Sequence, residues 1–169
     1  MPRILGIDPG SRITGYGLIE SDGRSSRHVA SGTIRTEGDD LAERLGAIFR
    51  GVGELIDAHQ PGEVAIESVF IAKNASSALK LGQARGAAIC ACAARALPVA
   101  EYTPRAVKLA IVGAGGADKA QVQHMVRVLL KLTEPLTADS ADALGIALCH
   151  AHTDAAPAVL AARRMGRGR

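Results

Sequence analysis

Four acidic side chains lie at the borders of apolar stretches of this chain: Asp8, Glu67, Asp139 and Asp142. The first two each follow a short apolar run, and the last two precede one. A desolvated anion costs several kcal/mol unless a cation or hydrogen bonds compensate it. If the fold brings the four together, the compensating group is a hard divalent metal ion, which prefers carboxylate oxygens. Two such ions in one acidic cluster are suited to the hydrolysis of phosphodiester bonds.

Three of these acids also have a structural explanation when each is taken alone. Asp8 begins an Asp-Pro-Gly sequence, which is common in turns, and Asp139 and Asp142 could cap a helix and complement its dipole. Glu67 has neither role, because it lies inside the largely apolar run 64–71. For the four acids to have no common role, all of these structural explanations would have to be true at once. This favours a shared site.

The elements that must position the acids follow from residue periodicity and turn signals. Three early strands joined by short turns predict an antiparallel meander, and the later alternation of helices and strands is an α/β layer pattern. We expect strands at 4–8, 14–20, 27–35, 63–68 and 99–102, and helices at 41–59, 74–97, 104–112, after Asp118, and 137–152. Residues 1–154 read as one domain, and residues 155–169 as a basic, disordered tail.

The predicted elements allow the four acids to converge. Asp8 and Glu67 lie near the ends of the first and fourth strands, and they can meet if those strands are neighbours. Asp139 and Asp142 are three residues apart on a helix, so both face the same way. Without cations such a cluster would repel itself and keep some members protonated. With two Mg²⁺ about 3.5–4 Å apart, all four can stay ionised.

Charge is distributed unevenly along the 169 residues, whose net charge is +3. Residues 68–138 carry nine basic and three acidic side chains, whereas residues 1–67 carry seven basic and eleven acidic ones. A basic middle beside the acidic cluster suits a polyanion held across a metal site. Solvated surface lysine and arginine explain the same counts.

The three cysteines are an odd number in apolar surroundings, which is typical of reduced thiols in a cytoplasmic protein. The sequence shows neither a signal peptide nor an apolar run long enough to cross a membrane. We therefore expect a cytoplasmic protein.

Five stretches resemble one protein family, in the right order: residues 5–17, 65–75, 77–86, 118–125 and 139–144. The family is that of the RuvC Holliday-junction resolvases, or crossover junction endodeoxyribonucleases, and the resemblance extends from about residue 3 to residue 153. It implies an RNase H-like α/β fold, with a central mixed five-stranded sheet flanked by helices. It also implies a homodimer that cooperates with a branch-migration motor.

The resemblance further implies an activity and its site. The expected activity is paired, symmetric nicking of four-way DNA junctions, leaving 5′-phosphates, in homologous recombination and DNA repair. Matched by position, Asp8, Glu67, Asp139 and Asp142 are the catalytic ligands of two Mg²⁺ per subunit, for which Mn²⁺ may substitute.

Candidate DNA contacts follow from the same resemblance. Phe70 matches a base-stacking wedge of the family, and stacking on an unpaired base is worth roughly 1–3 kcal/mol; a place in the core is the alternative. Lys108 and Lys119 match basic positions near the scissile phosphate, with ordinary surface charge as the alternative. Four further residues are weaker candidates for phosphate contacts: Lys73, Asn74, Arg105 and Gln121.

Two other classes of function are consistent with parts of the sequence. Asp8-Pro9-Gly10-Ser11 resembles the first phosphate loop of actin-like and sugar-kinase-like phosphotransferases, but their second loop and second domain have no counterpart here. A non-catalytic module that binds junctions would keep the four acids for structural reasons. Calorimetry with Mn²⁺ distinguishes that module from an enzyme. In a protein that only binds junctions, Glu67→Gln should remove no metal site.

The segment Cys149-His150-Ala151-His152 has the residue types of a zinc site. No second ligand pair follows at the usual spacing. We therefore interpret its histidines as residues at a helix end.

Overall fold

The computed structural model describes residues 1–68 and 74–165, with side chains placed as far as residue 154. Within these residues five strands form one sheet: β1 (Arg3–Asp8), β2 (Ile13–Ser21), β3 (Ser26–Arg35), β4 (Glu63–Glu67) and β5 (Val99–Tyr102). Their order in the sheet is β3-β2-β1-β4-β5. The pairs among β1, β2 and β3 are antiparallel, and β1–β4 and β4–β5 are parallel. The predicted mixed five-stranded sheet is therefore confirmed.

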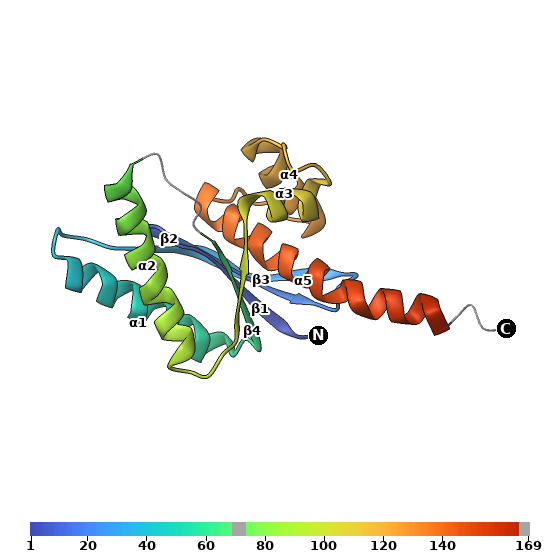
Figure 1. Cartoon of the computed structure of the whole chain (residues 1–169), viewed down its shortest axis with the longest axis horizontal. Helices are drawn as coiled ribbons and strands as arrows, with labels where there is room; N and C mark the ends of the chain where they lie inside the picture. Colours follow the sequence, from blue (N-terminus) through green and yellow to red (C-terminus); the bar gives the residue numbers. More distant parts are fainter. Residues whose placement is uncertain (69–73, 166–169) are drawn as a thin grey trace.

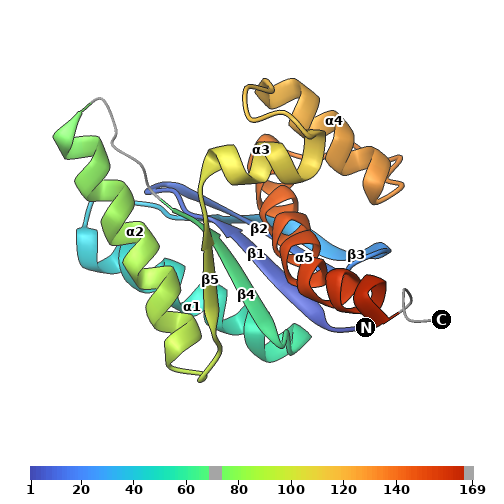
Figure 2. The same cartoon turned by 45° about the vertical axis from the view of Figure 1, so that its right-hand side comes forward.

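The helices cover both faces of this sheet: α1 (Leu41–His59), α2 (Ala75–Ala93), α3 (Pro104–Val112), α4 (Lys119–Leu129) and α5 (Ala138–Met165). Figures 1 and 2 show α1 and α2 on one face, and α3, α4 and α5 on the other. One apolar core lies under α1 and α2, and a second lies under α3, α4 and α5.

Alternation along the strands explains the two cores. Leu5 and Ile7 of β1 belong to the core under α1 and α2, whereas Ile4 belongs to the core under α5. In β4, Val64 lies on the first side and Ala65 on the second. Successive side chains of a strand point to opposite faces, so strand position alone decides which helices a residue meets.

Local signals set most helix boundaries. Asp40, Thr103 and Asp118 each cap a helix, accepting a hydrogen bond from a backbone N–H of its first turn. Gly113 ends α3 in the left-handed conformation, which glycine adopts without strain. These boundaries agree with the sequence-based predictions.

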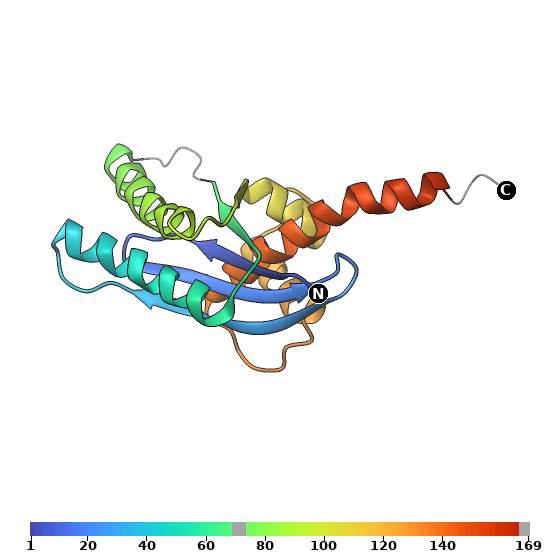
Figure 3. The same ribbon diagram turned by 90° about the horizontal axis from the view of Figure 1, so that it is seen from below.

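Two predicted helix ends were wrong. The helix predicted for 74–97 ends at Ala93, because residues 94–96 close it in a turn with Ala96 at a φ of +54°. The last helix was expected to end near His152 but continues to Met165, through a segment whose alanines favour helix although Pro157 opposes it. Figure 3 shows this end of α5 extending beyond the sheet. The division into a domain of residues 1–154 and a tail of residues 155–169 stays a prediction.

None of the helices in the described part of the chain is both long enough and apolar enough to cross a membrane.

Candidate active site

Strand pairing and alternation bring Asp8 and Glu67 together. In the parallel pair β1–β4, Ile7 lies opposite Ile66, and the two acids follow one residue later on each strand. Asp8 shares the face of Gly6, against which α5 packs, and Glu67 shares the face of Ala65. Both carboxylates therefore lie at the ends of neighbouring strands on the side of the sheet that α5 covers.

The first turn of α5 supplies the other two acids. The backbone N–H of Ser140 donates to Thr137 Oγ1 at 3.2 Å, and the Ser140 hydroxyl donates to the Thr137 carbonyl at 3.0 Å. This local bonding begins the helix just before Asp139, so Asp139 and Asp142 lie one turn apart. Figure 1 shows the start of α5 near the end of β4.

Glycines let α5 lie directly on the sheet. Gly15 of β2 lies opposite Asp8, and a Cβ at Gly15 would be only 2.1 Å from the carbonyl oxygen of Asp139. A Cβ at Gly6 would be 2.1 Å from the carbonyl oxygen of Ala143. The absence of side chains at these two positions therefore sets how closely the first turns of α5 approach β1 and β2.

The cluster is electrostatically strained. Burial, followed by the charges of Glu67, Asp142 and Asp139, raises the pKa of Asp8 from 3.8 to about 7. Burial and the charge of Asp142 raise the pKa of Glu67, against the opposing effects of Lys119 and Lys108. Asp8 and Glu67 thus lie close enough to other acidic groups for the negative charge to disfavour their ionisation.

One lysine partly compensates this negative charge. Lys119 Nζ lies 2.8 Å from Asp142 Oδ2, and the pKa of Lys119 is raised by this hydrogen bond. The Lys119 side chain is 64% exposed, and that of Asp142 is 23% exposed. The ammonium group therefore remains within reach of a ligand that enters from solvent.

A cleft of about 280 Å³ opens at this cluster between α3, α4 and the start of α5. Two acids and two lysines face it together with three apolar residues; its lining is Glu67, Pro104, Val107, Lys108, Lys119, Val122 and Asp142. Anionic and cationic groups in one cleft suit a phosphate chain bound beside a metal site.

The donor set fits hard divalent cations, although the carboxylates do not form a closed cage. The four predicted ligands are all carboxylates, which Mg²⁺ prefers to sulfur or imidazole. The raised pKa of Asp8 shows that burial and neighbouring negative charges disfavour its ionisation, an effect that a bound cation would offset. In the part of the chain that the structure describes, a different set of three residues has potential ligand atoms within 4.8 Å of one another: Glu63, His150 and Asp154. At the predicted site, one carboxylate, that of Asp142, is paired with Lys119 instead.

The predicted DNA contacts fall into three groups. Lys108 and Lys119 line the cleft, and their contact with a phosphate stays a prediction. Arg105 is exposed on the same helix as Lys108, and Asn74 is exposed as the N-cap of α2. Gln121 takes part in the capping box of α4 with Asp118. None of the three lines the cleft. Phe70 and Lys73 lie outside the described residues.

Two features near the site escaped the sequence analysis. Arg85 Nε donates to the carbonyl oxygen of Glu67 at 3.1 Å, and Arg85 also pairs with Glu101 at 2.8 Å, so it holds the end of β4. The helical spacing of Arg85 gave no signal of this long-range contact. His150, expected at a helix end, lies inside α5 and is only 6% exposed.

The raised pKa of Asp8 makes a prediction about stability. Since the folded state holds this proton more tightly than the unfolded chain, metal-free protein should lose stability as pH rises from about 4 to about 7. The rise from 3.8 to about 7 corresponds to at most about 4 kcal/mol, and residual hydration of the half-buried carboxylate reduces it. We expect Asp8→Asn to raise the free energy of unfolding by about 1–3 kcal/mol at pH 8 and by almost nothing at pH 4.

Urea denaturation in chelator-treated buffer at the two pH values measures this difference. Asp22→Asn is the matched control, because backbone N–H groups of Ser25 and Arg24 lower the pKa of Asp22. That variant should instead lose stability at high pH. Equal stability of Asp8→Asn and the unmodified chain at pH 8 would contradict the electrostatic account.

Comparison with known proteins identifies the family of this chain. Residues 4–150 match the family described as crossover junction endodeoxyribonuclease RuvC. A protein of that name from Shewanella loihica is 61% identical over 153 residues, covering 90% of this chain and 88% of that protein. One from Methylococcus capsulatus is 60% identical over 152 residues, covering 90% and 92%.

Solved structures agree as well. The structure of Thermus thermophilus RuvC in complex with a Holliday junction substrate has a TM-score of 0.86 at 36% identity, covering 91% of this chain and 95% of that one. The yeast mitochondrial resolvase Ydc2, at 12% identity and a TM-score of 0.64, shares the fold. The predicted RNase H-like fold is confirmed, and this chain belongs to the RuvC family of crossover junction endodeoxyribonucleases.

Proposed function

We propose that this protein is a structure-selective endodeoxyribonuclease that resolves four-way DNA junctions in recombination and repair. It makes paired symmetric nicks that leave 5′-phosphates. The observation that carries the proposal is the convergence of Asp8, Glu67 and Asp142, with Asp139 adding its charge, at a cleft that Lys108 and Lys119 also line. The match of residues 4–150 to the RuvC family supports the choice of a branched substrate.

Asp8, Glu67, Asp139 and Asp142 would hold two Mg²⁺, or Mn²⁺ in their place. When bound, these ions supply an activated water and stabilise the charge that develops on the leaving 3′ oxygen. The protein's own part is to hold four oxygen donors on three rigid elements, β1, β4 and α5. A phosphodiester in the cleft would then lie against these donors, beside the apolar side chains of Val107 and Val122 that also line it.

The two lysines supply positive charge from this chain. Lys108 lies in the middle of α3 and Lys119 at the start of α4, so rigid helices carry both. Each can contact a phosphate oxygen of the strand in the cleft, which fixes its position beside the carboxylates. The ammonium group of Lys119 is bonded to Asp142 and exposed to solvent, so a phosphate entering the cleft could compete with the carboxylate for it.

A homodimer would complete the reaction. A four-way junction is nearly two-fold symmetric, so a two-fold dimer places one site on each of two opposed strands. Two sites acting within the lifetime of one complex produce two nicked duplexes, which ligase can seal if the nicks carry 5′-phosphates. We place this activity in the cytoplasm, in cooperation with a branch-migration motor.

Cleavage of synthetic substrates tests the proposal. In Mg²⁺, a four-way junction should be cut at least about 10³-fold faster than a linear duplex of the same arm sequences, in line with the preference of DNA-binding proteins for specific sites. A replication fork serves as the intermediate substrate. Sealing of the products by DNA ligase without kinase treatment reports 5′-phosphates.

A plasmid with an extruded cruciform tests the pairing of the nicks. Paired cleavage converts it directly to linear DNA, whereas independent nicks produce open circles first. Tight junction binding without cleavage would indicate a binding module, and equal rates on junction and duplex would exclude structure selectivity.

A further inference from the structure

A second cluster of ligand-type side chains lies at the opposite ends of the elements that carry the acids. Glu63 begins β4, the strand that Glu67 ends, and Asp154 lies on α5 well beyond Asp142. At 1.5 Å per residue the separation along the helix is about 18 Å. This cluster is therefore distinct from the carboxylate site.

His150 is the centre of this cluster. Its Nε2 lies 2.8 Å from Glu63 Oε2 and 4.0 Å from Asp154 Oδ2, and its Nδ1 lies 2.7 Å from the hydroxyl of Tyr102. One ligand atom from each of Glu63, His150 and Asp154 falls within 4.8 Å of the other two. The imidazole is buried, at 6% exposure, while the Asp154 side chain is 66% exposed.

We propose that Glu63, His150 and Asp154 bind a divalent transition-metal ion, with Zn²⁺ as its best fit. A tetrahedral Zn²⁺ with ligands at 2.0–2.1 Å separates them by about 3.4 Å, and the two distances from His150 Nε2 lie on either side of that value. An imidazole nitrogen favours Zn²⁺ over Mg²⁺. The contact of Nδ1 with Tyr102 fixes the orientation of the ring, so that Nε2 faces the two carboxylates. A bound ion would replace the direct contact of Nε2 with Glu63.

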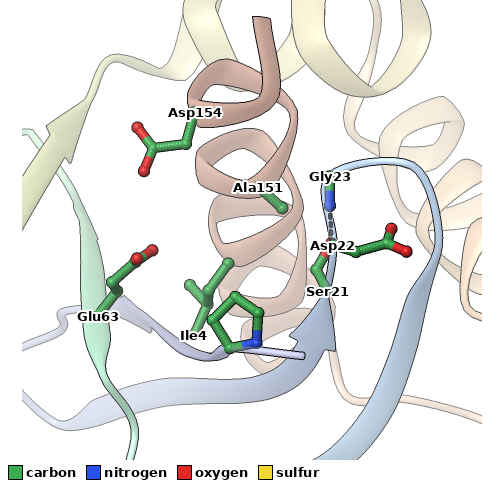
Figure 4. A pocket seen from close by; sticks show the side chains of 8 residues that line it. Ile4, Ser21, Asp22, Gly23, Glu63, Ala151 and Asp154 are labelled. Carbon is green, nitrogen blue, oxygen red and sulfur yellow. Dashed lines mark hydrogen bonds between the residues drawn. The ribbon is translucent and has the colours of Figure 1, made fainter. Parts of the chain in front are cut away.

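Space and access favour the same conclusion. Glu63 and Asp154 line two cavities, of about 270 Å³ and 220 Å³, so water can reach the cluster from either side as a fourth ligand. Figure 4 shows the two carboxylates directed into the same space, one from β4 and one from α5, above Ile4. A metal ion here would join the beginning of β4 to α5 and so anchor the helix that carries Asp139 and Asp142 at its other end.

The test measures thermal unfolding of the full chain, without a purification tag, with reduced thiols and after chelation. Saturating Zn²⁺, at about a hundredfold excess over its dissociation constant, should raise the midpoint by about 5–10 °C. Glu67→Gln, which alters the other site, should keep this rise. Mg²⁺ at the same concentration should not produce it.

Variants decide which residues bind the ion. The rise should be lost in His150→Gln and in Asp154→Asn, and the second variant changes an exposed side chain that the fold does not need. It should persist in His152→Gln, the matched control on the same helix, whose side chain contacts the carbonyl oxygen of Ala110. Bound Co²⁺ should give visible absorption bands of a four-coordinate site in the unmodified chain, and these should be absent in Asp154→Asn.

Three results would overturn the proposal. The first is no effect of Zn²⁺ on unfolding, which would leave His150 and Glu63 as a hydrogen-bonded pair only. The second is an undiminished rise in Asp154→Asn and His150→Gln. The third is a sulfur-to-cobalt charge-transfer band, which would assign the metal to a cysteine such as the exposed Cys90.

Discussion

Replacing Glu67 with glutamine is expected to slow Mg²⁺-dependent cleavage of a four-way junction by at least about 10³-fold. The amide keeps the shape of the side chain and the packing at the end of β4, but it removes a negative charge from the cluster. Glu67 faces the cleft beside Asp142 and adds to the charge that raises the pKa of Asp8. Single-turnover rates with the protein in excess measure the chemical step directly.

Two further measurements keep this result interpretable. Glu54→Gln on the exposed face of α1 is the matched control, and it should cleave at the unmodified rate. Gel-shift assays in Ca²⁺ should show that Glu67→Gln still binds the junction, since the lysines remain. Cleavage by Glu67→Gln at the unmodified rate would end the assignment of this acid as a catalytic ligand.

The pairing of Asp8 with Glu67 could be predicted from the sequence because strands obey a simple rule. Each acid closes a short apolar run, and the alternation of side chains sends both to one face once the strands are parallel neighbours. The helical spacing of Asp139 and Asp142 was equally plain. The alternation of side chains along a strand and their spacing along a helix depend on only a few neighbouring residues, so tertiary packing changes them little.

The remaining features depend on contacts between distant residues. Arg85 reaches the end of β4 across the helix–sheet interface, and Tyr102, His150 and Glu63 come from three separate elements. In the sequence, His150 stands out only beside Cys149 and His152. Its partner Asp154 lies on the same helix face at i+4, and this position becomes visible only once the helix is known to continue past His152. The end of α5 differs from the prediction because the arginines near the end of the chain are typical of a basic tail as well as of a helix end.

The seating of α5 on the sheet is the other long-range feature, and Gly15→Ala tests it. The added methyl group would overlap the carbonyl oxygen of Asp139, a backbone atom that cannot rotate aside, so the first turn of α5 must move away from β2. Overpacking of this kind costs about 1–3 kcal/mol of stability, and a shift of about 1 Å at the carboxylates can cost about 10²-fold in rate. We expect both losses, measured by denaturation and by single-turnover junction cleavage.

Gly62→Ala is the control for this substitution, because nothing lies within 4 Å of the Cβ it would add. It should leave both the rate and the stability nearly unchanged. The comparison that matters is the rate of Gly15→Ala at a temperature where the variant is fully folded. A normal rate there would show that the carboxylates tolerate a displaced helix, whereas a hundredfold loss would show that a missing side chain on β2 positions the acids of α5.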